Sequence, residues 1–364
     1  MGLPVPRPFR APYVPGITVL IPHYGESILA VRDELHGGEE ERSRHVPLID
    51  WLHAHYADEL RAFLERQRAR PGGARWPALG SPWSAYTREQ WDKLCVWASM
   101  RMQTLWRTVA GVCLYHPALQ CHYEVQGDRR SCLARLDVWD PSDCFTCLVS
   151  MQMYKFFDEV QLLQTSRMLE KFPRSLKVAF IDSEEKNINA EADLMHPRQR
   201  RRYFSCLIDR ACPALPDGRR TPRWRVELPG YPILGDGKGD NQNHALPFAR
   251  GAFAQCIDAN QGGYFEQMLL LPCALGEFRS RWRGDSASKR IIGLPEHVTS
   301  GVGSIGDFAA SAEHAFGTIL QRSFAALGAR MHYGHPDLMS KFAMMQQGGV
   351  SKATKTLNLS EDIF

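Results

Sequence analysis

The sequence predicts an α/β protein, because short apolar runs with the length of buried strands alternate with longer segments of helical spacing. Several of these runs end at an aspartate, and ligands of α/β sheets bind beyond the carboxyl ends of strands. The chain has 364 residues and is 44% hydrophobic, which is enough for one large domain or two fused ones.

The first elements are a strand and two helical regions. Ile17–Pro22 (ITVLIP) predicts a buried strand, and His23–Ser27 follows it as a loop. Helical spacing is found at Leu48–Gln67 and, as one long pattern, at Gln90–Val112. Between them, Arg70–Ser84 is rich in Gly, Pro and Trp, which predicts a surface loop.

The middle of the chain continues the alternation. Phe145–Gln152 predicts a strand and Asp158–Glu170 a helix. Leu176–Ile181 predicts a short strand that ends at Asp182–Glu185. The polar segment Asn187–Arg202 is expected to form a mobile loop.

Three more strands and two helices complete the pattern. The strands are expected at Phe204–Asp209, Arg223–Leu228 and Ala252–Ile257, and the helices at Gly263–Phe278 and Phe308–Leu327. Each of Asp182, Asp209 and Asp258 follows a short apolar run. These aspartates are therefore expected at the ligand-binding edge of the sheet.

Composition excludes several classes of protein. Lys and Arg number 44 against 40 for Asp and Glu, so no basic excess indicates a nucleic-acid partner. The basic run Arg198–Arg202 is interpreted as a solvated loop or helix face. No stretch has the roughly 20 apolar residues of a membrane span, and no signal peptide is expected. The ten cysteines have no framework spacing, which indicates reduced thiols in the cytosol.

The densest polar stretch lies in Pro232–Glu266. Between residues 236 and 244 it holds Asp236, Lys238, Asp240, Asn241, Gln242, Asn243 and His244. A packed core has no use for so many polar groups, because each buried one needs a hydrogen-bond partner. Such a run is typical of a site that holds a sugar and a diphosphate.

Three common motifs have simpler explanations here. Gly301–Gly306 matches GxGxxG, but the segment before it is a poor strand, so we interpret it as a loop that precedes a helix. Cys144 and Cys147 form a lone CxxC without a second pair of metal ligands, which favours buried reduced cysteines. His53 and His55 are interpreted as surface histidines.

Other motifs leave two interpretations open. Asp258-Ala259-Asn260 ends an apolar run and is either a cation site for a leaving diphosphate or an Asx turn. Lys352 and Lys355 lie on a glycine-rich loop that either cradles a diphosphate or is a solvent loop. Ser360-Glu361-Asp362 is either a helix amino terminus or the source of a general base.

Taken together, the motifs resemble the catalytic region of 1,3-β-glucan synthases, the fungal glucan synthases and plant callose synthases. In order along the chain the resemblance rests on Thr18–Glu26, Trp97–Ser99, Gln103–Gly111, Val149–Gln152, Pro232–Lys238, Asp240–His244, Ile257–Gln261, Met331–Asp337, Gly348–Lys352 and Ser360–Phe364.

The resemblance implies a GT-A-like glycosyltransferase domain with a mixed central sheet flanked by helices. It implies inverting transfer of glucose from UDP-glucose to a growing 1,3-β-glucan acceptor. It also implies a cytosolic location on a multi-pass plasma-membrane protein, and a Rho-type GTPase as regulator in fungi. We expect one domain over residues 1–364 with a candidate helical insertion around residues 48–112.

The resemblance also assigns residues. Asp182, Asp209, Glu361 and Asp362 are the expected catalytic residues. Asp182 and Asp209 would bind the uridine-ribose or the donor sugar, and Asp362 is assigned as the base by analogy with the T-E-D element of processive synthases. The substrate-binding residues would be Arg107, Lys238, Asp240, Asn241, Gln242, Asn243, His244, His332, His335, Lys352 and Lys355. The one cofactor suggested is Mg²⁺ at Asp258 and Asn260, and Asn260 in place of a second acid weakens that site. The segment Arg107–Gly111 matches a UDP-glucose signature, but we interpret it mainly as helix packing.

The chain departs from the family at a few places. Gly239 replaces the usual Ser or Pro, Arg210 follows Asp209 where fungal members have Gly, and an arginine is missing near Gly293–His297. Family members also continue beyond the segment that matches Ser360–Phe364, so we expect a fragment. The alternative function is a non-catalytic nucleotide-sugar-binding fragment or regulatory subunit with the same fold.

Overall fold

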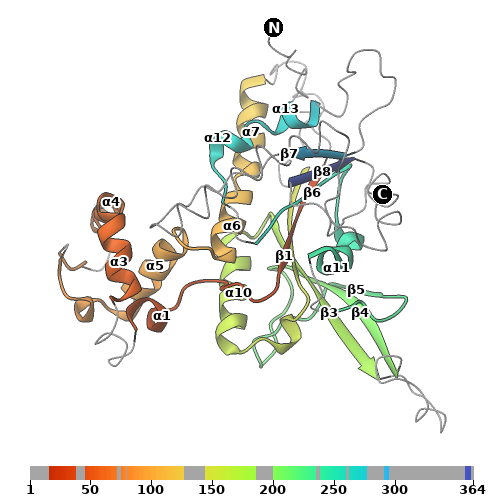
Figure 1. Ribbon diagram of the computed structural model, residues 1–364, viewed down its shortest axis with the longest axis horizontal. Coiled ribbons are helices and arrows are strands. Elements are labelled where there is room, and N and C mark those ends of the chain that lie inside the picture. The colour runs from red at the N-terminus through yellow and green to blue at the C-terminus, as the bar shows by residue number, and fades with distance from the viewer. Residues whose placement is uncertain are drawn as a thin grey trace.

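The computed structural model describes residues 16–37, 46–71, 75–78, 80–126, 144–185, 200–234, 238–259, 262–276, 291–294 and 357–361. Within these ranges, eight strands form one sheet in the order β5-β4-β3-β2-β1-β6-β8-β7 (Figure 1). The strands are β1 (Ile17–His23), β2 (Phe145–Met151), β3 (Leu176–Glu185), β4 (Arg201–Ile208), β5 (Trp224–Glu227), β6 (Phe253–Cys256), β7 (Ile291–Leu294) and β8 (Leu357–Glu361).

Helices alternate with these strands, which confirms the predicted α/β class. The α-helices are α1 (Arg32–His36), α3 (Leu48–His55), α4 (Ala57–Arg68), α5 (Arg88–Ser99), α6 (Leu105–Val112), α7 (Tyr115–Gln126), α10 (Glu159–Lys171), α11 (Lys238–Asn243), α12 (Phe265–Met268) and α13 (Leu271–Gly276). The part of the chain that the structure describes also has three short 3₁₀ turns, η2 (Trp83–Ala85), η3 (Tyr154–Phe156) and η6 (Leu246–Phe248). Of the helices described, none combines the length and the apolar character needed to cross a membrane.

The sheet is mixed. The chain first adds parallel strands on one side of β1 and later adds a parallel strand on its other side. β1 pairs in parallel with β2 and β6, and β2 with β3. β4 and β5 are antiparallel to their neighbours. The chain therefore moves outward from β1 to β3 and later returns to place β6 on the other side of β1. Ligands of doubly wound sheets bind at such a switch point, outside the carboxyl ends of the strands.

Helices cover both faces of the sheet, and each face carries a buried apolar cluster. Every residue of β1 and β2 is buried. Alternate side chains point to opposite faces. Val19 and Ile21 belong to the large cluster formed with α6, α7 and α10. Leu20 packs on the other face with Ala245 and Phe248, which follow α11 (Figure 1).

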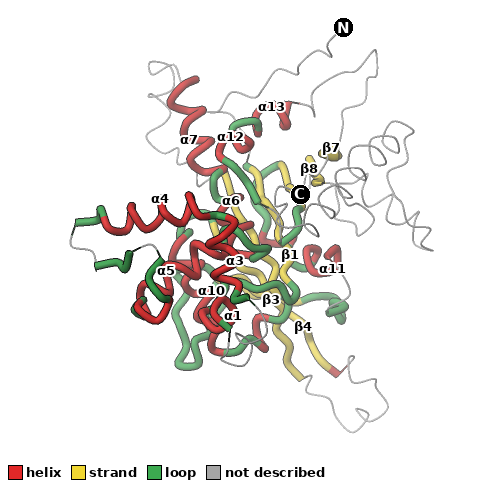
Figure 2. Tube along the Cα trace, turned by 60° about the vertical axis from the view of Figure 1, so that its left-hand side comes forward, coloured by secondary structure: helices red, strands yellow, loops and turns green. Residues whose placement is uncertain are grey.

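A second core lies among the helices near the amino-terminal end of the described chain. Leu52, Leu60, Trp91 and Leu94 form a buried cluster of their own, separate from the clusters of the sheet. The helices α1, α3, α4 and α5 that carry it lie together to one side of the sheet (Figures 1 and 2). Whether residues 48–112 are an insertion stays a prediction.

Three expected helices are each divided in two. The pattern at Leu48–Gln67 forms α3 and α4, which are separated at Tyr56. The pattern at Gln90–Val112 forms α5 and α6, because Thr104 caps a new helix: its side chain accepts a hydrogen bond from the backbone N–H of Arg107 at 3.3 Å. The pattern at Gly263–Phe278 forms α12 and α13. In the expected surface loop Arg70–Ser84, Trp76 is buried in the helical core. The expected helix Phe308–Leu327 lies outside the described residues.

Strand β3 is longer than predicted. It continues through Asp182 to Glu185, and β4 begins at Arg201 within the segment expected to be a loop. Asp182 pairs with Phe204 across the two strands. As Figures 1 and 2 show, β3 and β4 extend as a long ribbon beyond their neighbours. Asp182 therefore lies inside a strand and not in a loop that follows one.

Candidate functional site

The loops that follow β1 and β6 meet at the switch point. The backbone N–H of Ile257 donates to the carbonyl of Leu20 at 3.1 Å, so the chain after β6 stays beside β1. The loop after β1 is braced by Glu26. Its Oε2 accepts the N–H of Tyr24 at 2.8 Å, and its carbonyl lies 2.8 Å from the His23 ring nitrogen Nε2.

Acidic side chains from three elements gather around the Tyr24 hydroxyl. Burial is the main reason that the pKa of Tyr24 is raised above its ordinary value, and the nearby side chain of Asn241 opposes this rise. The carboxylates of Asp240, Glu26 and Asp258 raise the pKa further. The loop after β1, helix α11 and the loop after β6 therefore bring these carboxylates within electrostatic range of Tyr24. Carboxylates accept hydrogen bonds from sugar hydroxyls or attract cations.

Two of the predicted substrate ligands instead fix this edge of the sheet. Asn241 donates from Nδ2 to the carbonyl of His23 at 2.9 Å. Gln242 donates from Nε2 to the carbonyls of Leu20 at 3.0 Å and Ile257 at 3.5 Å. Because Asn241 is 0% exposed and Gln242 only 3%, neither can meet a ligand without a rearrangement. They attach α11 to the carboxyl ends of β1 and β6.

His244 is also part of the core. Its Nε2 lies 2.7 Å from Ser150 Oγ on β2, and its Nδ1 lies 3.0 Å from Ser205 Oγ on β4. Burial lowers the pKa of His244 to about 3, so the imidazole is neutral near pH 7. The expected contact with a substrate is therefore replaced by a bridge between two strands. Asp240 and Asn243 are half-buried on α11, and the side chain of Lys238 lies outside the described part.

Acidification is expected to destabilise the chain through His244. The pKa of His244 is about 3 in the folded chain and about 6.5 when unfolded, so the unfolded chain takes up the proton first as the pH falls. The stabilising contribution is complete above about pH 6.5 and is lost progressively toward pH 3. Urea unfolding measures the free energy of unfolding at pH 7 and at pH 5. The decrease from pH 7 to pH 5 should be about 2 kcal/mol larger in wild type than in His244→Gln. Equal losses in both proteins would contradict this assignment.

Helix α6 holds the loop that follows β6. Thr108 donates from Oγ1 to the carbonyl of Ala259 at 2.7 Å. Gly111 packs so closely that a Cβ there would lie 2.9 Å from Cα of Gly263. Arg107 is 9% exposed, and its guanidinium packs beside Gly262. The segment Arg107–Gly111 is thus a packing element, as interpreted from the sequence, and it supports the backbone next to Asp258.

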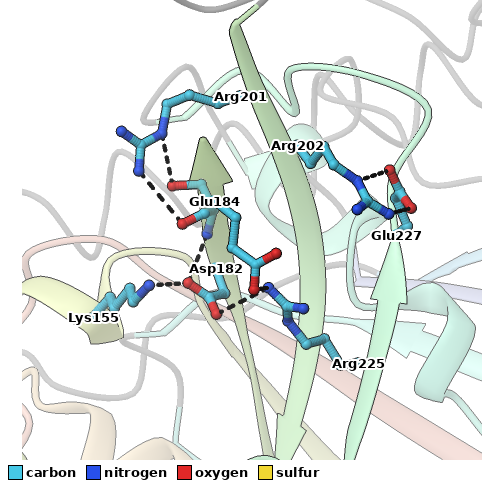
Figure 3. Close-up of polar contacts among 8 residues, drawn as sticks. Lys155, Asp182, Glu184, Arg201, Arg202, Arg225 and Glu227 are labelled. Carbon is cyan, nitrogen blue, oxygen red and sulfur yellow. Dashed lines mark hydrogen bonds and ion pairs between the residues drawn. The ribbon is translucent and has the colours of Figure 1, made fainter. Parts of the chain in front are cut away.

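Asp182 is engaged in ion pairs away from this site. It pairs with Lys155, and its Oδ2 lies 3.5 Å from Arg225 on β5 (Figure 3). Oδ1 also accepts the N–H of Ser183 at 2.7 Å. Since β3 is separated from β1 by β2, the structure does not bring Asp182 together with Asp258. Its catalytic role stays a prediction.

The same ion-pair network fixes the β3–β4–β5 ribbon. Arg225 also pairs with Glu184, and its guanidinium carbon lies 3.4 Å from the centre of the Phe204 ring. Arg202 Nε donates to Glu227 at 2.7 Å, and Arg201 Nε to Ser183 Oγ at 3.2 Å (Figure 3). The last two residues of the basic run are therefore paired on a strand, although exposed pairs contribute little individually.

The prediction that Asp209 lies with Asp182 and Asp258 at the ligand-binding edge of the sheet is wrong. Asp209 follows β4, which runs antiparallel to β3, so it lies beyond the amino ends of the parallel strands. Asp209 pairs with Arg223 at 2.9 Å. Glu361, the last residue of β8, pairs with Phe253 at the amino end of β6. The structure therefore separates both residues from Asp258.

The remaining predicted ligands cannot be placed. Asn260, His332, His335, Lys352, Lys355 and Asp362 lie outside the described residues, as does the GxGxxG segment. Among the residues described, no group of three His, Cys, Asp or Glu side chains is arranged to hold a metal ion. Mg²⁺ at Asp258 and Asn260 stays a prediction. Cys144 and Cys147 are free thiols, and burial raises the pKa of Cys147.

Three residues of this edge were missed as site residues. Tyr24 and Glu26 carry a readable signal, because they directly follow the apolar run of β1. Thr108 lies in a motif interpreted as helix packing, but its partner Ala259 is far along the chain. Sequence spacing contains no information about such a contact.

The comparisons with known proteins point to one family. The family model described as 1,3-beta-glucan synthase component matches residues 80–364. The chain belongs to the 1,3-β-glucan synthase family. It is 34% identical to the 1,3-beta-glucan synthase component FKS1 of Aspergillus niger over 407 residues, which cover 100% of this chain and 21% of the relative.

Fungal and plant relatives match this chain about equally well. It is 32% identical to the 1,3-beta-glucan synthase component bgs1 of Schizosaccharomyces pombe, with 99% of this chain and 22% of the relative covered. It is 33% identical to callose synthase 3 of Arabidopsis thaliana, with 95% of this chain and 18% of the relative covered. The chain spans about a fifth of the length of these relatives.

Proposed function

We propose that the chain is catalytic-region sequence of a 1,3-β-glucan synthase, an inverting transferase that moves glucose from UDP-glucose to a growing 1,3-β-glucan. The observation that carries this proposal is the strand switch between β1 and β6, because Glu26, Asp240 and Asp258 gather at its carboxyl edge. Doubly wound sheets bind nucleotides at this place. The family membership adds the substrate class.

The proposed reaction needs charged groups for two tasks, binding the donor sugar and neutralising the diphosphate. The carboxylates at the edge accept hydrogen bonds from donor-sugar hydroxyls. The diphosphate needs positive charge, which Lys238, Lys352 and Lys355 or a Mg²⁺ ion at Asp258 would supply. Inversion also needs a base for the acceptor hydroxyl, and Asp362 is our candidate.

The wider setting of the reaction follows from the resemblance alone. We include in the proposal a GT-A-like domain over residues 1–364, on the cytosolic side of a plasma-membrane synthase. A Rho-type GTPase would be the regulator in fungal members. These statements concern the whole synthase, of which this chain spans about a fifth.

Asp258→Asn is expected to weaken binding of UDP-glucose by about tenfold, the effect of losing one charge-assisted hydrogen bond. Isothermal titration of the chain with UDP-glucose and Mg²⁺ measures this, with and without chelator. Asp58→Asn on α4 is the matched control, because Asp58 is an exposed carboxylate on the helical cluster. Equal affinity of wild type and Asp258→Asn would refute the site.

The same protein should be assayed for transfer of labelled glucose into alkali-insoluble glucan. Transfer by the wild-type chain supports a catalytic role. Binding of UDP-glucose without transfer would favour the alternative, a nucleotide-sugar-binding fragment or regulatory subunit. Failure to bind UDP-glucose at all would remove both functions from this chain.

A further inference from the structure

A basic pocket lies at the amino ends of the parallel strands, the end of the sheet opposite to the proposed donor site. Its volume is about 480 Å³, within the range of small-molecule sites. It lies between the start of β3 and the segments that flank the β4–β5 connection. The charged residues that line it are Arg174, Lys177, Asp209, Arg210 and Arg223.

Among the described residues that line the pocket, the one carboxylate is already engaged. Asp209 accepts the N–H of Ala211 through Oδ1 at 2.9 Å and pairs with Arg223 through Oδ2 at 2.9 Å. It therefore balances one cation. Among the described residues, no carboxylate lies within ion-pair distance of Lys177 or Arg210, so the pocket keeps an excess of positive charge.

The surroundings of Lys177 are unfavourable for its own charge. Burial is the main cause that lowers the pKa of Lys177, and the charge of Arg250 lowers it further, while Asp209 acts in the opposite direction. Lys177 is half-buried, and a cation partly removed from water beside other cations is disfavoured unless a counter-charge accompanies it. An anion in the pocket would supply that counter-charge.

We propose that this pocket binds a phosphate-bearing anion, held by Lys177 and Arg210 at the amino edge of the sheet. A guanidinium and an ammonium group together suit phosphate oxygens, which accept several charge-assisted hydrogen bonds. The ligand is either a soluble phosphate compound or the headgroup of an anionic lipid. The site is separate from the donor site, because β4 places Asp209 at the opposite edge from Asp258.

The test uses the full chain with two probes, pyrophosphate in solution and phosphatidylcholine vesicles that contain phosphatidic acid. Lys177→Gln and Arg210→Gln should each weaken binding about tenfold, since each removes a charge-assisted contact. Arg66→Gln on α4 is the matched control and should bind like wild type. Circular dichroism melting checks that all variants are folded.

The two probes distinguish the sources of the anion. Tighter binding to vesicles than to pyrophosphate supports a lipid headgroup, and binding to pyrophosphate alone supports a soluble anion. No binding of either probe by wild type, or unchanged binding by folded Lys177→Gln and Arg210→Gln, overturns the proposal. Titration of the same variants with UDP-glucose measures the proposed donor site by itself. The result for the anion pocket can therefore be distinguished from the result for the proposed function.

Discussion

Gly111→Ala is expected to destabilise the chain by about 3 kcal/mol, the upper range for overpacking a filled interior. The added methyl would lie 2.9 Å from Cα of Gly263, a backbone atom that cannot rotate away. Either α6 or the loop after β6 must move. Because Thr108 of α6 also bonds to Ala259, the displacement should extend to Asp258 and weaken UDP-glucose binding.

Urea unfolding followed by circular dichroism measures the loss of stability, and titration with UDP-glucose measures the second effect. Gly230→Ala is the matched control, because a Cβ at Gly230 would meet no atom within 4 Å. The control should stay within about 0.5 kcal/mol of wild type. If Gly111→Ala were as stable as Gly230→Ala, the close packing of α6 on Gly263 would be refuted.

Trp91→Ala is expected to lower the free energy of unfolding by about 3–5 kcal/mol. The loss of structure should be confined to the helical cluster. Trp91 is 1% exposed. Its ring lies 5.6 Å from that of His36 and 5.9 Å from that of Trp83, and the Arg32 guanidinium lies 5.4 Å from its centre. Removing the indole leaves a cavity between α1 and α5 that its neighbours cannot fill.

Hydrogen exchange measured by mass spectrometry locates the loss. If residues 48–112 include a separable insertion, amides of α3, α4 and α5 should lose protection while those of β1–β3 keep it. An equal loss in the sheet would show that the helices and the sheet unfold as one unit. Trp224→Ala is the matched control, because Trp224 is 56% exposed on β5.

The sequence predicted elements well where burial is complete and signals are local. All residues of β1 and β2 are buried, and both strands were expected as apolar runs. Helix α10 begins after Asp158, whose side chain accepts the N–H of Gln161 at 2.8 Å. This is a local signal of a helix start. Thr104 carries the same kind of signal, and it separates α6 from α5 within the long helical pattern Gln90–Val112.

The site could be predicted only in part, because it depends on contacts between distant residues. The sequence shows the polar run that includes Asn241, Gln242 and His244, but not that these three side chains are buried. Sequence does not tell a polar side chain that binds a ligand from one that satisfies buried carbonyls or hydroxyls, as all three do. Likewise, an apolar run predicts a strand but not its direction, and the direction of β4 decides the position of Asp209.

The place of β1 in the sheet also has a consequence for folding kinetics. Ile17 pairs with Phe145 on one side and Phe253 on the other, so the central strand finds both partners far along the chain. Contacts of such long range slow folding. During synthesis β1 emerges well before either neighbour, and its apolar run stays without strand partners meanwhile. The helical cluster, whose contacts are local, can form first, whereas β1 gains its second neighbour only after β6 has left the ribosome.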